Sequence, residues 1–198
     1  MPHVTRYHPV LVIMHWGLAF LIVVSLGLGA LVLAHLPNSD PTKLAGLRAH
    51  MVGGMAILAL MLLRLIVRST SAHPAPARTG HPFLDTLARV SHRMFYPAVF
   101  MMAGSGLALA IESGALAIVF GHQGALPADF WIFTPRRVHY LVSRVLMALI
   151  ALHVAGALYH TFVLRDGLLR RLWFGRRVAT ASAALPSTFN RHIAQVKQ

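Results

Sequence analysis

The sequence contains no cysteine and very few acidic residues. Without cysteine, the chain can form no disulfide and can hold neither a thiolate metal site nor an iron–sulfur cluster, so a metal bound by its side chains has to use histidine. Asp and Glu together number 5, against 18 Lys and Arg. Charged residues make up 12% of the chain and hydrophobic residues 57%. This balance excludes an ordinary soluble domain.

Apolar runs take up most of the chain. Four of them approach or exceed the roughly 20 residues that cross about 30 Å of hydrocarbon, namely 10–36, 47–67, 90–111 and 138–164. The first run lacks the small-residue cleavage site of a signal peptide, so we expect it to be retained. The segment from Glu112 to Arg136 is expected to be a loop on the membrane interface. The sequence therefore predicts an all-α integral membrane four-helix bundle over 1–172, followed by a poorly ordered polar tail, 173–198.

The basic residues stand at the ends of these runs. A net charge of +13 would suggest nucleic-acid binding in a soluble protein, but here membrane topology explains it better, so we expect lipid and no nucleic acid as a partner. With the N-terminus inside, 13 of the 18 Lys and Arg lie on the inner side. Both termini are therefore predicted to be cytoplasmic. The outer side keeps five basic residues, Lys43, Arg48, Arg136, Arg137 and Arg144.

Four histidines lie inside the apolar runs: His15, His50, His139 and His153. An ionisable group there is costly and marks a candidate functional site, although a hydrogen bond between helices is the alternative for each one. The fourteen-residue step from His139 to His153 rotates a helix by about −40° and rises about 21 Å, so both imidazoles share one face at two depths. By depth, His50 matches His139 near the outer face and His15 matches His153 near the inner face. The sequence predicts two bis-histidine sites.

Two imidazoles in an apolar bundle suit haem better than zinc. Zinc usually takes a third and a fourth protein ligand, and the spans carry no Asp or Glu at these levels. Haem needs two axial imidazoles, a dry slot and space beside the ligand. Gly53 and Gly54 follow His50 and Gly156 follows His153, which leaves room for a flat macrocycle, although small residues in membrane helices also pack backbones.

Haem propionates need cationic partners at the polar ends of the bundle. Arg48 and Arg144 are the candidates for the outer site. Arg64 lies near the level of the inner site, and its alternative role is that of a snorkelling anchor at the membrane surface.

Several motifs accompany these histidines: MHWG at 14–17, RAHMVGG at 48–54, LMLLRLIVR at 60–68 and ALYH at 157–160. Together with the spacing of His139 and His153, they resemble the prokaryotic cytochrome b561 family over about residues 5 to 172. The resemblance implies a four-helix diheme b-type cytochrome of the bacterial inner membrane. It implies His15, His50, His139 and His153 as axial ligands of the haem iron, paired as depth pairs them.

Members of this family are linked to quinone, and some resemble a superoxide oxidase. The resemblance therefore implies one-electron transfer between a reductant at the outer face, with superoxide as a candidate, and ubiquinone. Arg136 and Arg137 would steer a small anion to the outer face, or else pair with propionates. His160 and His92 are the candidates for a quinone site at the inner boundary. The family often has two adjacent histidines where this chain has His160 and Thr161.

Two other functions remain compatible with the same residues. The chain could be a cytochrome b anchor subunit that passes electrons between a dehydrogenase or hydrogenase partner and quinone. It could also be a haem-free transporter or histidine-based metal carrier, which would be colourless.

Overall fold

The computed structural model describes residues 4–121 and 124–175. Within these residues every regular element is a helix, and four helical spans are long and apolar enough to cross a membrane. The predicted all-α bundle with four membrane-length helices is confirmed. Most of the tail predicted from residue 173 lies outside the described residues.

Each crossing is one continuous helical span, and the first and last spans change to π-helix before they end. In chain order the elements are α1 (Pro9–Gly27), the π-helix η1 (Leu28–Leu33), α2 (Pro41–Thr70), α3 (Pro82–Glu112), the short α4 (Ala115–Gly121), α5 (Thr134–Leu158), the π-helix η2 (Tyr159–Leu164) and the 3₁₀-helix η3 (Leu168–Leu172).

A proline stands in the first turn of each of the four spans. Proline suits this position because its fixed φ fits the helix and the amide hydrogen that it lacks would have no helical partner there. At α2 the cap is completed by Asp40, whose carboxylate accepts a hydrogen bond from the Thr42 amide at 2.8 Å. The helices therefore begin before the apolar runs do: α2 starts at Pro41 and α3 at Pro82. Caps, rather than hydropathy, set these boundaries.

The core lies where the middles of the four spans meet. It contains Leu18 of α1, Ile57 and Met61 of α2, Val99 of α3 and Leu146 of α5, all buried. Large apolar side chains cover the outside of the bundle as well: Phe20 is 68% exposed and Leu31 is 74% exposed. An apolar exterior of this kind is what a lipid-facing helix requires, since lipid offers polar groups no partner.

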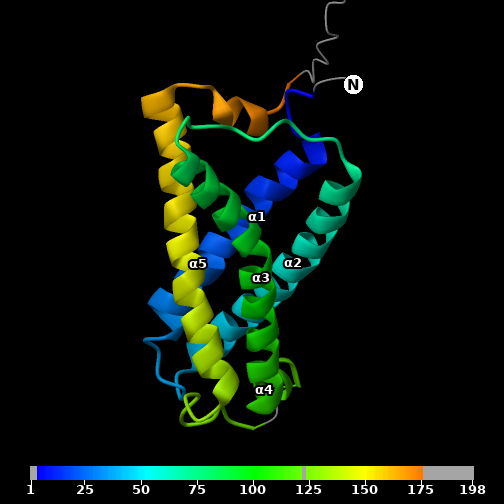
Figure 1. The fold of residues 1–198 in the computed structure, drawn as a ribbon. Coiled ribbons are helices and arrows are strands. Elements are labelled where there is room, and N and C mark those ends of the chain that lie inside the picture. The colour runs from blue at the N-terminus through cyan, green and yellow to red at the C-terminus, as the bar shows by residue number, and fades with distance from the viewer. Residues whose placement is uncertain (1–3, 122–123, 176–198) are drawn as a thin grey trace, which may run out of the picture.

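One end of the bundle carries the start of α1, the loop 71–81 and the segment 165–174 (Figure 1). We call it the terminal end. The segment crosses this end and is tied to the start of the chain, because the Tyr7 amide donates to the Arg171 carbonyl at 3.2 Å and Trp16 Nε1 donates to the Leu172 carbonyl at 3.2 Å. Arg171 in turn donates to the Ala75 carbonyl in the loop at 3.0 Å.

The opposite end, which we call the α4 end, carries α4 and the loops before α2 and α5 (Figure 1). Asn38 joins these loops, since its Nδ2 donates to the Pro127 carbonyl at 2.7 Å and to the Ala128 carbonyl at 3.0 Å. Lys43 is only 7% exposed, and its ammonium donates to the Leu36 carbonyl and to Asn38 Oδ1. By sequence Lys43 is grouped with the outer cations, but in the structure its ammonium holds the loop before α2 in place.

Candidate functional site

The first histidine pair lies toward the α4 end. His50, near the start of α2, faces His139, near the start of α5, and their ring centroids are 6.0 Å apart. The two rings are steeply inclined, at 77°. This is the pair whose depths along the two spans the sequence matches.

The second pair lies toward the terminal end. His15 of α1 faces His153 of α5, with ring centroids 6.1 Å apart. A third imidazole adjoins this pair, because the ring of His92 on α3 lies 5.0 Å from that of His153. Phe95, one turn further along α3, also contacts the His153 ring, at 5.5 Å. The terminal-end pair therefore has an aromatic wall on the α3 side.

The separation within each pair fits two axial ligands on one metal. An imidazole nitrogen binds a metal at about 2.0 Å and lies about 1.1 Å from its own ring centroid, so two imidazoles on opposite sides of one metal have centroids about 6.2 Å apart. The observed values are 6.0 and 6.1 Å. Among the described residues no group of three His, Asp or Glu side chains could hold a metal ion. Each donor set thus suits a group that needs two imidazoles and no more.

Hydrogen bonds fix the His139 ring. Its Nδ1 lies 3.1 Å from the Met102 carbonyl and 3.2 Å from Ser105 Oγ. A bond from Nδ1–H to a backbone carbonyl leaves Nε2 unprotonated and oriented, which is the usual second-shell support of a metal-binding histidine. His50 differs, because its Nδ1 is buried and has no hydrogen-bond partner within the described residues.

Two glycines make room for the rings of the α4-end pair. A Cβ built on Gly29 would lie 3.3 Å from His50 Cε1, and one built on Gly106 would lie 3.1 Å from His139 Cε1 and 3.3 Å from its Nδ1. The backbones of η1 and α3 can approach the imidazoles this closely because neither residue has a side chain. Gly54 and Gly156, by contrast, have no such neighbour within 4 Å, so open space adjoins both positions.

Three of the predicted cationic residues have partners in the protein. Arg48 donates to the Val119 carbonyl at 2.6 Å through Nη2, which ties α2 to α4. Arg64 is half-buried, and its Nη1 donates to the Leu11 carbonyl at 3.1 Å. Arg144 is exposed and stacks over the Tyr140 ring at 4.7 Å.

Arg136 and Arg137 lie side by side at the start of α5, in different surroundings. Arg136 is half-buried, with its guanidinium 4.6 Å from the centre of the Trp131 ring. Arg137 is exposed. Trp131 in turn packs edge-on against Tyr140 at 5.3 Å. The α4 end, toward which the His50 and His139 pair lies, thus carries two aromatic rings packed edge to face, each with a guanidinium group over it.

His160 lies in η2 at the terminal end and is buried. Its Nδ1 is 2.6 Å from Asp166 Oδ2, and Asp166 belongs to the segment that crosses this end. Burial alone would raise the pKa of Asp166, but hydrogen bonds from His160 and from the Leu168 amide hold that pKa below its usual value. The carboxylate is therefore charged at neutral pH. Sequence reasoning missed this partner, which stands six residues away from His160 and beyond the apolar run.

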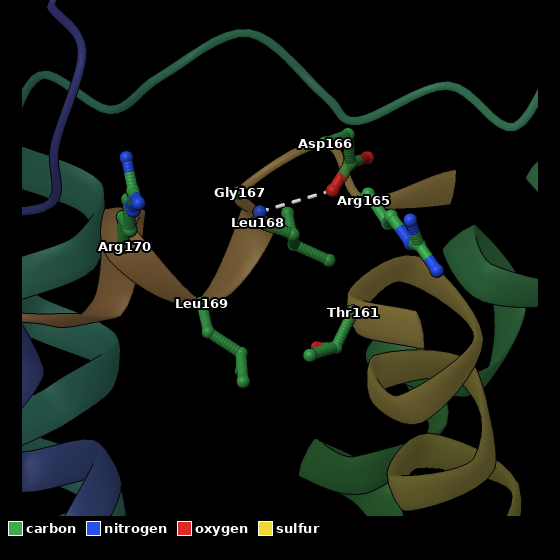
Figure 2. A pocket seen from close by; sticks show the side chains of 7 residues that line it. All are labelled: Thr161, Arg165, Asp166, Gly167, Leu168, Leu169 and Arg170. Atoms are coloured by element: carbon green, nitrogen blue, oxygen red, sulfur yellow. Dashed lines mark hydrogen bonds between the residues drawn. The ribbon is translucent and has the colours of Figure 1, made fainter. Parts of the chain in front are cut away.

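Asp166 also lines a cavity of about 430 Å³. Figure 2 shows Arg165 and Arg170 on either side of this cavity, with Leu168 and Leu169 between them and Thr161 at the end of the helix. The cavity thus brings a cationic rim, an apolar wall and one carboxylate next to His160.

Met102, Ser105 and Gly106 were also missed. The run Gly104-Ser105-Gly106 inside an apolar span is a signal that could have found them, because small residues one after another permit close approach of a neighbouring helix. Which side chain approaches is decided by the packing of α3 against α5.

Four membrane-length helices with two facing imidazole pairs at two depths define a membrane cytochrome of the b type. The family model of prokaryotic cytochrome b561 matches residues 6–175, and the chain belongs to this family. The family implies a b-type haem and a role in electron transfer in a bacterial membrane.

Two curated relatives agree with this assignment. The chain is 30% identical over 126 residues to "Probable superoxide oxidase CybB" of Yersinia pestis, an alignment that covers 62% of this chain and 72% of the relative. It is 24% identical over 175 residues to "Cytochrome b561 homolog 2" of Escherichia coli (strain K12), which covers 84% of this chain and 90% of the relative.

Proposed function

We propose that the chain binds two b haems, one between His50 and His139 and one between His15 and His153, and carries electrons one at a time across the membrane. The electrons pass between a reductant at the α4 end and ubiquinone at the terminal end. The observation that carries this proposal is the distance between the two ring centroids within each imidazole pair, 6.0 Å in one pair and 6.1 Å in the other. A single pair would serve only one side of the membrane.

The chain's own residues prepare each site. Haem, when bound, supplies the one-electron redox chemistry. The Met102 carbonyl orients His139, and Gly29 and Gly106 admit the two rings of the α4-end pair. Arg48, Arg64 and Arg144 are the candidates for holding propionates, and Arg64 is the one placed within the bundle near the terminal-end pair.

The charge distribution supports an orientation. Of the 18 Lys and Arg, 13 belong to the terminal end or to the segments that follow it in sequence, so the terminal end is cytoplasmic by the positive-inside rule and the membrane is the bacterial inner membrane. The α4 end then faces outward. There Arg136 and Arg137 outnumber the nearby Asp129, which favours the approach of a small anion.

Superoxide is the reductant that best fits an anion-attracting α4 end and a relative named as a superoxide oxidase. Each superoxide gives up one electron and leaves as O₂. Two such transfers reduce one ubiquinone, which also takes two protons and becomes ubiquinol. At the terminal end, His160 and His92 are the candidates to hydrogen-bond the quinone and to supply its protons, since a neutral imidazole both donates and accepts.

The test is a visible spectrum of the detergent-purified chain, recorded as dithionite-reduced minus air-oxidised, with a pyridine haemochrome assay of haem per polypeptide. We expect a b-type α-band and about two haems per chain. One haem per chain would reject the two-site proposal. A colourless protein from cells supplied with haem would indicate a transporter or metal carrier instead.

A second measurement tests the direction of transfer. The purified chain, with ubiquinone-1 as acceptor, is exposed to superoxide from xanthine oxidase, and ubiquinol is measured. Superoxide-dependent ubiquinol formation that exceeds the protein-free control supports the proposal, and none would reject superoxide as the donor.

A further inference from the structure

We propose that Asp166 is a positioning residue for His160: it holds the Nδ1 proton of the buried imidazole, so that Nε2 can pass a proton to quinone. This inference rests on the proposed reduction of quinone at the terminal end. It assigns a function to a carboxylate that the histidine pattern does not indicate.

The backbone around His160 is built to make this contact. His160 lies in the π-helix η2, Tyr159–Leu164, and π-helical turns are frequent at functional sites. Directly after it, Arg165 adopts the left-handed region with φ of 51°, and it is the one non-glycine residue among those described with a positive φ. Such a conformation is costly and persists when surrounding interactions hold it. Gly167, with φ of 69°, completes the reversal that turns Asp166 back onto His160.

The pair of His160 and Asp166 lies between the buried interior of the bundle and the cavity at the terminal end. The His160 side chain is 10% exposed and the Asp166 side chain is 29% exposed, and Asp166 lines the open cavity of Figure 2. At 2.6 Å the bond between Nδ1 and Oδ2 is short, as expected when one partner is charged. Because Nδ1 is occupied in this way, the imidazole exchanges protons with a substrate through Nε2.

The charges around the pair keep the Asp166 carboxylate ionised. The guanidinium of Arg171 acts on Asp166, and its attraction adds to the hydrogen bonds that lower the pKa of Asp166. The Arg165 guanidinium donates through Nε to the Phe162 carbonyl at 3.3 Å. The phenol ring of Tyr159 is the aromatic neighbour of His160, at 6.4 Å. The ionised Asp166 thus accepts from His160 Nδ1 and is not itself the proton donor.

The step balances as follows. Ubiquinone accepts two electrons, which arrive singly through the chain, and two protons. His160 gives one proton from Nε2 to a quinone oxygen, Nε2 then takes up another proton from water, and the second proton is transferred in the same way. The two O–H bonds of ubiquinol form, and two protons leave the cytoplasmic water.

A structural role for Asp166 is the competing explanation. Its Oδ1 accepts a hydrogen bond from the Leu168 amide at 3.0 Å and so starts η3. The variant Asp166→Asn separates the two roles, because the amide oxygen still accepts that bond while the negative charge beside His160 is lost. The matched control is Asp85→Asn at the same end of the bundle. The Asp85 carboxylate likewise accepts from a backbone amide, that of Thr79 at 2.7 Å, and among the described residues it forms no ion pair with a histidine side chain.

The experiment uses the full chain with its haem bound. Wild type, Asp166→Asn, Asp85→Asn and His160→Gln are reduced with dithionite, freed of the excess reductant, and mixed anaerobically with ubiquinone-1 in a stopped-flow instrument. The reoxidation rate is followed from about pH 6 to about pH 8.5. We expect Asp166→Asn to be slower by roughly tenfold or more at pH 8. Asp85→Asn should match wild type throughout.

The outcomes distinguish the inference from the function on which it rests. If Asp166→Asn is reoxidised as fast as wild type at every pH, Asp166 only caps η3 and the inference is wrong. If His160→Gln reacts like wild type, quinone reduction stands but the proton path does not. If ubiquinone-1 fails to reoxidise the wild-type chain, the proposed function and the inference both fall.

A readout independent of turnover uses ¹⁵N-histidine NMR of the wild-type chain, with the His160 signals assigned by their loss in His160→Gln. At a pH where the ring is neutral, we expect the proton on Nδ1 and a bare Nε2. The opposite tautomer would overturn the inference even if Asp166→Asn failed to fold.

Discussion

Gly106 on α3 lies directly against the ring of His139 on α5. A Cβ at this position would stand 3.1 Å from Cε1 and 3.3 Å from Nδ1, closer than a carbon side chain normally approaches. The ring is also fixed by the Met102 carbonyl, so it has little freedom to move aside. The glycine and the carbonyl, one turn apart on the same helix, set where the imidazole stands.

We expect Gly106→Ala to weaken haem binding at the α4-end pair. The added methyl displaces the imidazole by a few tenths of an ångström or breaks its bond to Met102, and loss of such support typically costs 10- to 100-fold in metal affinity. Haem per chain and the reduced-minus-oxidised spectrum are the measurements. Gly104→Ala on the same helix, where nothing lies within 4 Å, is the control. Equal haem loss in the two variants would show that the glycine serves only helix packing.

His153→Ala should remove the terminal-end haem and reduce the haem content to about half, because the remaining His15 has no partner across the site. His35→Ala is the matched control, since His35 is exposed in the turn that follows η1. The pyridine haemochrome assay counts the haem in both. Similar losses from the two substitutions would refute the ligand assignment.

Asn38→Ala should destabilise the α4 end by about 1–3 kcal/mol while the haem spectrum is retained. The substitution removes two hydrogen bonds to the loop before α5 and one acceptor from the buried Lys43 ammonium, and buried polar groups left without partners cost about this much. Thermal unfolding in detergent measures the change. Ser143→Ala, which loses a bond within one helix to the Tyr140 carbonyl, should shift the midpoint much less. An equally large shift of the unfolding midpoint in Ser143→Ala would contradict a specific role of Asn38 in joining the two loops.

Asp40 should make stability depend on pH in the acidic range. The side-chain and backbone hydrogen bonds from Thr42 lower the pKa of Asp40 in the folded chain. A carboxyl with a depressed folded pKa contributes stability above its unfolded pKa of about 3.9, and the contribution disappears as the pH falls through the folded value. Wild type should therefore unfold at a higher temperature than Asp40→Ala at pH 7, with the gap closing toward about pH 3. A gap that is constant with pH would assign the effect to something other than the carboxylate.

The sequence predicts the depth of each histidine well and its surroundings poorly. A fourteen-residue step on one helix fixes the relative positions of His139 and His153 through helical geometry alone, and the topology then matches His50 and His15 to them. In the structure the ring centroids lie 6.0 Å apart in the pair of His50 and His139 and 6.1 Å apart in the pair of His15 and His153. The Met102 carbonyl beside His139 depends on how α3 packs against α5, and no periodicity encodes that contact.

The helix boundaries and the terminal end show the same limit. Hydropathy starts the second and third spans at 47 and 90, whereas α2 and α3 begin at Pro41 and Pro82, because a proline in the first turn and the capping residue before it stabilise helix beyond the apolar run. The sequence does not predict the contact between Asp166 and His160, because this contact depends on a left-handed backbone conformation at Arg165, which a non-glycine residue disfavours. Local rules predict elements, while such contacts require the folded chain.

One histidine of each facing pair belongs to α5, which follows the other three described spans along the chain. A nascent chain that has inserted only α1, α2 and α3 holds His15 and His50 without partners, so neither facing pair exists at that stage. On the proposed ligand assignment, haem would load only after α5 has inserted, and a chain interrupted before α5 would stay without haem. Haem content would then report the insertion of α5.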